Sequence, residues 1–92
     1  MEKALATADF RIHGTDWNGK QFESAVHAGL YKSGSFTYGN GTCMVFEWSN
    51  GNDEVFDTRY DRVTPETFTE FAMRVLRGKL KKDVAIDVVK GE

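Results

Sequence analysis

Hydrophobic and polar residues alternate with a period of two through the middle of the chain, which is the pattern of β-strands with one buried face. The segments Ser35–Gly39, Thr42–Ser49 and Asp53–Arg62 follow this pattern, and each places aromatic or apolar side chains on one face. Asn40-Gly41 and Asn50-Gly51 separate the three segments. Asn-Gly is a strong signal for a tight hairpin turn, often with positive φ at both residues. The middle of the chain therefore predicts a three-stranded β-meander.

Two shorter apolar segments predict a strand near each end of the chain. Asp9–Gly14 alternates Phe10 and Ile12 with polar residues, and Val84–Val89 is rich in β-branched residues. Both segments are bounded by polar or turn-forming residues, as strands commonly are.

Residues Val63–Lys79 follow the helical period instead. Thr64 suits the N-cap, Pro65 suits the first helical position, and Gly78 suits the C-terminal end. The apolar stripe of this predicted helix consists of Phe68, Phe71, Ala72, Val75 and Leu76.

The segment from Asn18 to Gly34 fits two patterns. As a helix it has apolar or small residues at 22, 25, 26, 29 and 30, with Asn18 as a cap. As a strand it places alternate residues on one face, namely Phe22, Ser24, Val26, Ala28 and Leu30. Gly29 inside a helix costs about 1 kcal/mol relative to Ala. Length and capping favour the helix, and a strand over residues 19–32 remains the alternative.

Together these elements predict an α+β fold of order β-α-β-β-β-α-β, with an antiparallel sheet and both helices packed on its aromatic face. Residues 1–7 form a flexible N-terminal arm in this prediction, and residues 8–92 form one domain. The predicted core contains five aromatic residues, Phe46, Trp48, Phe56, Phe68 and Phe71.

Composition narrows the class of protein. The chain has 92 residues, of which 40% are hydrophobic and 13% aromatic, so it is a folded chain with one thin core. Its single cysteine, Cys43, excludes an intramolecular disulfide, and the first residues lack the apolar core of a signal peptide. These features predict a cytoplasmic protein.

Charge is distributed unevenly along the chain. Residues 47–70 carry seven acidic and two basic residues, whereas residues 71–92 carry six basic and three acidic residues. The acidic residues Asp53, Glu54, Asp57 and Asp61 lie in or beside the predicted last strand of the meander. On a strand, Asp53 and Asp57 lie about 13 Å apart at ~3.3 Å per residue, too far to share one metal ion. An acidic hairpin face is therefore a candidate protein-docking surface, or a solvated face with no partner.

Trp17 lies in "TDWNG", a turn-forming stretch where no period places it in the core. Tryptophan is a favoured anchor in protein interfaces. We therefore count Trp17 among the candidate partner-binding residues, with a cap over the core beneath the turn as its alternative role.

The basic end of the chain predicts an alternative function. The residues Arg74, Arg77, Lys79, Lys81 and Lys82 place five basic side chains at the end of the predicted helix and in the loop after it. Such a cluster suits phosphate contacts in a nucleic-acid-binding module. The sequence pI of about 5.7 argues against it.

Catalytic chemistry has little support in the sequence. His13 and His27 lie in different predicted elements, and no P-loop, dinucleotide fingerprint or zinc pattern is present. We therefore expect a non-enzyme without cofactor or metal, with a small enzyme as the third possibility.

The preferred hypothesis is a small protein-binding regulator, adaptor or inhibitor. Its partner would carry a basic surface, which the acidic face could engage by imitating the phosphates of nucleic acid. Small acidic blockers of phages and mobile elements share this size and charge. A homodimer through an exposed edge strand is a further expectation, and membrane association is not expected.

Overall fold

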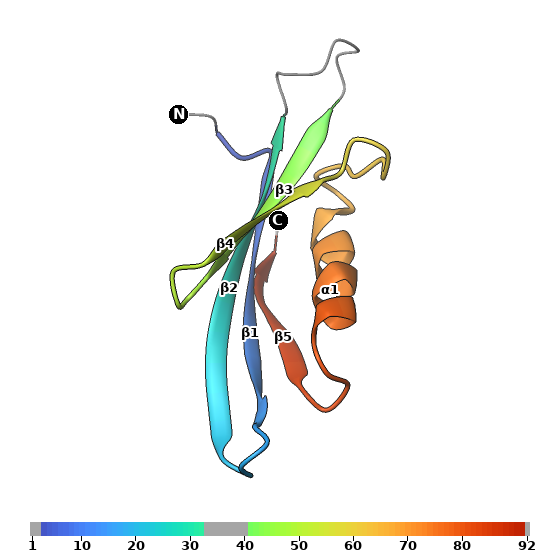
Figure 1. Ribbon diagram of the computed structural model, residues 1–92. Coiled ribbons are helices and arrows are strands. Elements are labelled where there is room, and N and C mark those ends of the chain that lie inside the picture. The colour runs from blue at the N-terminus through green and yellow to red at the C-terminus, as the bar shows by residue number, and fades with distance from the viewer. Residues whose placement is uncertain (1–2, 33–40, 92) are drawn as a thin grey trace.

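The fold is a five-stranded antiparallel sheet with one helix across one face (Figure 1). We analysed a computed structural model, which describes residues 3–32 and 41–91. Its elements, in chain order, are β1 (Ala6–Thr15), β2 (Gln21–Lys32), β3 (Thr42–Trp48), β4 (Asp53–Asp57), α1 (Phe68–Lys79) and β5 (Ala85–Gly91).

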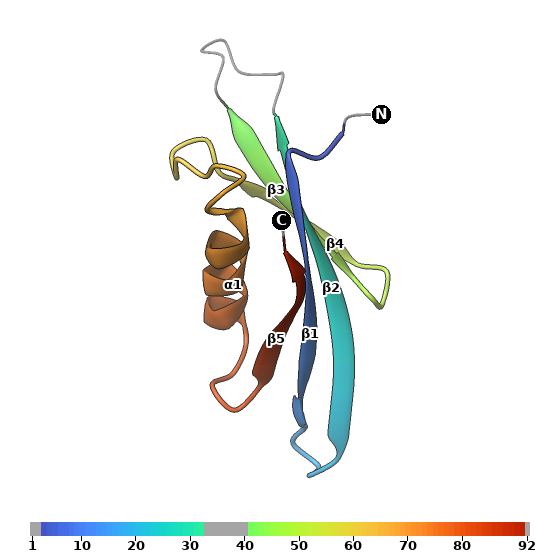
Figure 2. The ribbon, with the colours of Figure 1, turned by 180° about the vertical axis from the view of Figure 1, so that it is seen from behind.

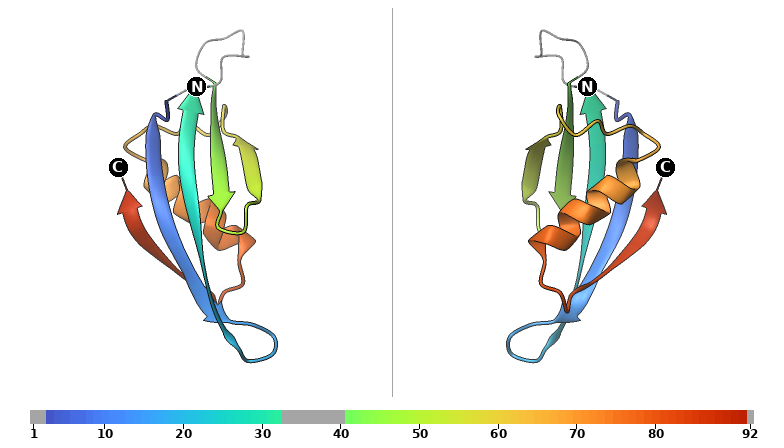
Figure 3. Two further views of the ribbon diagram at one scale, coloured as in Figure 1. Left: turned by 90° about the vertical axis from the view of Figure 1, so that its left-hand side faces the viewer. Right: turned by 90° about the vertical axis from the view of Figure 1, so that its right-hand side faces the viewer.

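The first four strands form a meander, and the chain then crosses the sheet. The strand order is β4-β3-β2-β1-β5, so β4 and β5 are the two edge strands of the described sheet. α1 carries the chain from the β4 edge to the β5 edge, and Figure 3 (right) shows it lying diagonally over the strands between them. Seen from behind, the helix again lies on one side of the sheet only (Figure 2).

The predicted order β-α-β-β-β-α-β is wrong, because the first predicted helix is a strand. Residues Gln21–Lys32 form β2, which pairs with β1 from Thr15↔Gln21 to Ala6↔Leu30 and with β3 along its other edge. A helix here would give up backbone hydrogen bonds to two neighbouring strands. The central position of β2 therefore outweighs the helical caps that the sequence offered.

Gly29 has a structural role that belongs to the strand. A Cβ atom built on it would lie 2.8 Å from Cε2 of Tyr31, because the Tyr31 ring lies back over Gly29 on the same face of β2. The glycine that weakened the helix prediction is thus the residue that leaves room for a neighbouring aromatic ring.

The other predicted elements are found with shifted ends. β1 starts at Ala6, which is buried, so Ala6 and Thr7 of the expected arm belong to the sheet. β4 stops at Asp57 rather than Arg62, and α1 starts at Phe68 after a turn at Thr64–Thr67. The predicted strand at 35–39 lies outside the described residues, as does Asn40 of the first Asn-Gly turn.

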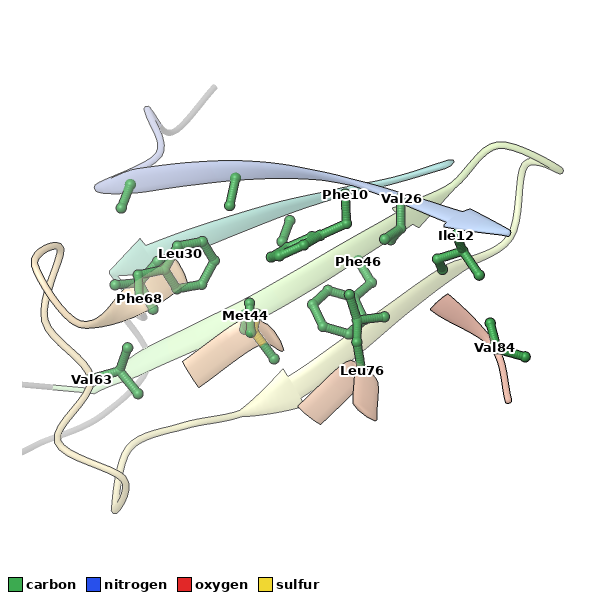
Figure 4. Close-up of a cluster of buried hydrophobic side chains, with 14 residues drawn as sticks. Phe10, Ile12, Val26, Leu30, Met44, Phe46, Val63, Phe68, Leu76 and Val84 are labelled. Atoms are coloured by element: carbon green, nitrogen blue, oxygen red, sulfur yellow. The ribbon is translucent and has the colours of Figure 1, made fainter. Parts of the chain in front are cut away.

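The core lies between the sheet and α1 (Figure 4). The sheet contributes alternate residues from each central strand, and the helix contributes Phe68, Ala72 and Leu76, which are fully buried. The fully buried residues with the largest side chains are Phe10, Phe46, Phe68, Leu30, Met44, Leu76 and Val26. Of the five aromatic residues predicted for the core, Phe46 and Phe68 are buried, whereas Trp48, Phe56 and Phe71 only pack against its edge.

The β3–β4 hairpin turns at Gly51. The Gly51 amide donates to the Trp48 carbonyl oxygen (2.9 Å), and Gly51 has φ +90°. Asn50 does not have positive φ. The turn is thus a three-residue loop with glycine in the left-handed region, rather than the two-residue turn with two positive φ values that the Asn-Gly pair predicted.

No helix among the described residues is long and apolar enough to cross a membrane.

Truncation of Phe68 tests the helix–sheet packing. Because Phe68 is fully buried, Phe68→Ala should lower the free energy of unfolding by about 3–5 kcal/mol. Phe71→Ala, at a partly buried position of the same helix, is the matched control and should cost clearly less. Urea denaturation measures both, and equal losses would contradict the described orientation of α1.

Substitution of Gly51 tests the hairpin turn. No atom lies within 4 Å of a Cβ built there, so a side chain meets no steric clash and only the backbone conformation opposes it. Gly51→Val should therefore lower the free energy of unfolding by about 1–2 kcal/mol or more. Gly51→Asn should cost less, since asparagine tolerates positive φ. Thermal melts that rank Val no worse than Asn would contradict this turn geometry.

Candidate functional site

The face of the sheet opposite α1 is uncovered in the described structure, as Figure 3 (left) shows. We call it the open face. Side chains along a strand point alternately to the two faces of the sheet, so every second residue of each strand has its side chain on the open face. The open face is strongly polar, and its charged residues and histidines come from all five strands: Asp9, Arg11, His13, Glu23, His27, Glu47, Asp53, Asp57 and Asp87.

The strand register lines up four of these residues across the sheet. Asp9 on β1 pairs with His27 on β2, His27 pairs with Glu47 on β3, and Glu47 pairs with Asp53 on β4. We call these four residues the acidic row. Neighbouring strands lie about 4.8 Å apart, so the row places acidic side chains at short intervals across four strands.

Both histidines of the chain are on the open face, and each bonds to an aspartate. His27 Nδ1 lies 2.5 Å from Asp9 Oδ1, and His13 Nε2 lies 2.9 Å from Asp87 Oδ2. These four side chains are all between about two-fifths and three-fifths exposed. Each pair fixes the orientation of an imidazole on a solvent-accessible sheet.

Two further carboxylates have a cationic partner. Glu23 lies 3.8 Å from Arg11, and Asp57 lies 2.9 Å from Arg59. In the described part of the chain, Glu47 and Asp53 have neither an ion pair nor a side-chain hydrogen bond, although they lie directly opposite each other. Like charges in this position are unfavourable in a sheet.

An apolar strip runs beside the acidic row. Gly29 pairs with Val45, and Val45 pairs with Val55, whose side chain is 70% exposed. The Tyr31 ring lies over Gly29 at the end of this strip. Aromatic residues are enriched in protein-binding surfaces, which have an apolar centre and a polar rim.

The four acidic residues predicted as a docking surface do not share one face. Asp53 and Asp57 lie on the open face. Glu54 points to the other side of β4, where it accepts hydrogen bonds from Trp48 Nε1 (2.9 Å) and Lys79 Nζ (2.6 Å). Asp61 lies in a turn beyond β4. Glu54 lies on the other face because neighbouring residues of a strand alternate, and Asp61 leaves the sheet because β4 ends at Asp57.

Four acidic residues of the open face were not among the predicted site residues: Asp9, Glu23, Glu47 and Asp87. The signal for Glu47 was present, because its strand was predicted with the correct alternation. Asp9, Glu23 and Asp87 could join it only once β2 was known to be a strand between β1 and β3.

Trp17 is 89% exposed at the tip of the β1–β2 hairpin, so it is not a cap over the core. The turn that carries it is well bonded. Asp16 Oδ1 accepts hydrogen bonds from the amides of Asn18 and Lys20, each at 2.9 Å, and the Asp16 amide donates to the Lys20 carbonyl. The indole is therefore presented to solvent by an ordered turn.

The structure places the five predicted basic residues in different surroundings. Lys79 binds Glu54 and lies over the Phe56 ring, so it belongs to the helix–sheet contact. Arg77 Nη2 donates to the Lys81 carbonyl oxygen. Arg74, Lys81 and Lys82 are exposed.

The His–Asp pairs are the groups of the open face that bear on catalysis. A His–Asp pair can serve as a general base, but no described serine or threonine hydroxyl is bonded to either imidazole. The hollow beside Asp9 and His27 has a volume of about 640 Å³ and is open to solvent. In the described residues, no three His, Cys, Asp or Glu side chains converge as a metal site.

Comparison with known proteins gives no relative from which a function could be transferred: no family model, curated protein or solved structure matches this chain.

Proposed function

We propose that the protein is a small cytoplasmic protein-binding regulator or inhibitor, and that the open face is its binding surface. The observation that carries this proposal is the pair Glu47 and Asp53, two adjacent carboxylates without a cationic partner among the described residues. A partner's arginine or lysine between them would remove their repulsion and form charge-assisted hydrogen bonds.

The surrounding residues suit the same kind of partner. The open face presents six carboxylates, and only two of them are paired with arginine. The strip of Val45, Val55 and Tyr31 offers apolar contact area next to the charges. A basic surface with some apolar area at its centre complements this face in charge and in composition.

A nucleic-acid-binding protein is the class of partner that fits best. Its binding site is built to hold a line of negative charges. The acidic row offers three carboxylates in a line across four strands, with His27 between Asp9 and Glu47. In this proposal the protein acts by occupying such a site, and it performs no chemistry itself.

The first prediction concerns binding. The double variant Glu47→Gln/Asp53→Asn keeps side-chain shape and removes the charges that lack a partner, so it should lose most captured partner and show a slower association rate. Asp61→Asn/Glu66→Gln is the matched control, because it removes two exposed acidic charges outside the open face. Quantitative pull-down from the host, followed by association kinetics at two salt concentrations, measures both.

If the control variant loses the partner as strongly as the open-face variant, net charge rather than this surface determines binding, and the proposal fails. If neither variant loses it, the open face is not the interface. Glu54 is left unchanged in this design because it anchors Trp48 and Lys79.

The second prediction concerns stability. Glu47→Gln removes a like-charge contact with Asp53, so it should raise the free energy of unfolding by about 0.2–1 kcal/mol at low salt. The gain should shrink in about 1 M salt, where the screening length falls to ~3 Å. Urea denaturation at both salt concentrations measures it, and a loss of stability would show that Glu47 has a favourable partner in the fold.

A further inference from the structure

The end of the molecule that carries the β1–β2 turn combines an exposed aromatic ring with basic side chains. The loop between α1 and β5 lies beside this hairpin (Figures 1 and 3). Trp17, Phe22, Lys81 and Val84 line a common hollow of about 300 Å³, together with Thr15, Asp16 and Asp83. Residues more than sixty positions apart in the sequence are thus brought to one surface.

A line of basic residues leads to this hollow along the outer side of α1. Arg74 and Arg77 are exposed on the helix, and Arg77 contacts the Lys81 carbonyl oxygen, which places the guanidinium against the loop. Lys81 borders the hollow, and Lys82 follows it. We call Arg74, Arg77, Lys81 and Lys82 the basic track. It lies on the helix side of the sheet, away from the open face.

Trp17 has the properties of a stacking platform. Its side chain is 89% exposed, and the turn that holds it is fixed by the Asp16 carboxylate and by Gly19 at φ +78°. An ordered turn reduces the conformational entropy lost when a ring stacks on the indole. Two backbone hydrogen bonds add to this order. The Asp16 amide donates to the Lys20 carbonyl oxygen (2.8 Å), and the Gly19 amide donates to the Asp16 carbonyl oxygen (3.0 Å).

We propose that this end of the molecule binds single-stranded nucleic acid, with a base stacked on Trp17 and phosphates along the basic track. Proteins that bind single strands combine an aromatic platform with a positive path for the backbone. A base pair inside a duplex exposes no free face to stack on, so the single strand is the preferred form. Trp17 and the basic track are not among the charged residues and histidines of the open face, and the two proposals stand or fall separately.

A negative charge at the hollow allows the proposal to be tested by a gain in affinity. The Asp83 carboxylate is exposed at the same hollow as Lys81, and it repels a phosphate there. The Asp16 carboxylate also borders the hollow and repels a phosphate too, but it accepts the two amide hydrogen bonds that hold the turn, so Asp83 is the one to neutralise. Asp83→Asn should therefore strengthen binding, a result that loss of structure would not produce.

The experiment uses the full chain and a fluorescein-labelled single-stranded oligothymidylate of about ten nucleotides, a length within the usual site size. Fluorescence anisotropy at low salt gives the affinity. Trp17→Ala should weaken binding about 5- to 150-fold. Tyr60→Ala is the matched control, since Tyr60 is 84% exposed and lies in the β4–α1 connection, distant from the hollow. It should bind like the wild type.

Salt dependence tests the basic track. Lys81→Gln/Lys82→Gln should weaken binding and reduce the slope of log affinity against log salt by about 1.4, from two lost phosphate contacts at ~0.7 each. Lys3→Gln/Lys32→Gln removes the same charge from exposed positions at the opposite end of β2 and should leave the slope unchanged.

Three results would overturn the proposal. One is wild-type affinity in both Trp17→Ala and Lys81→Gln/Lys82→Gln. Another is an equal loss in Tyr60→Ala and Trp17→Ala. The third is binding to phosphatidylserine-containing vesicles, lost in Trp17→Ala, with no binding to the oligonucleotide, because the ligand would then be an anionic membrane.

Discussion

The structure depends on one asymmetry: among residues 3–32 and 41–91 a single helix covers a five-stranded sheet. Phe68, Ala72 and Leu76 of α1 pack on the alternate residues of the central strands, and this contact buries one face. A chain of this size has no second layer for the other face among its described residues. That face must therefore be compatible with water, and it carries charged residues, two histidines and a narrow apolar strip.

The same asymmetry separates the charges of the molecule. Alternation along the strands directs acidic side chains to the open face, whereas the basic residues near the end of α1 and in the following loop lie on the helix side. The separation is incomplete, since Arg11 lies on the open face and Glu54 meets Lys79 at the edge of the core. The uneven charge of the linear sequence thus becomes a difference between two surfaces, which is the condition under which charge can guide a partner to one of them.

Two proposed binding surfaces follow from this arrangement, and they call for ligands of opposite charge. The carboxylates of the open face suit a basic protein, and the basic track with Trp17 suits a polyanion. A protein with both would be able to contact a nucleic-acid-binding protein and a free single strand at once, since the sheet lies between the two surfaces. In these proposals the acidic residues of the open face also repel nucleic acid, which favours binding of a strand at the Trp17 end.

The sequence by itself determined the elements whose period is unambiguous. The strand at Thr42–Trp48 and the apolar stripe of α1 were predicted because only one secondary structure places their apolar residues on one face. The position of the turn at Gly51 followed from its glycine, whereas the type of turn did not. Tertiary contacts, in contrast, selected the secondary structure of residues 21–32. Phe22, Val26 and Leu30 are four residues apart, a spacing that aligns them on a helix and on a strand alike. Only the hydrogen bonds from β1 and β3 on both edges selected the strand, and that choice set the register that brings Asp9, His27, Glu47 and Asp53 into one row.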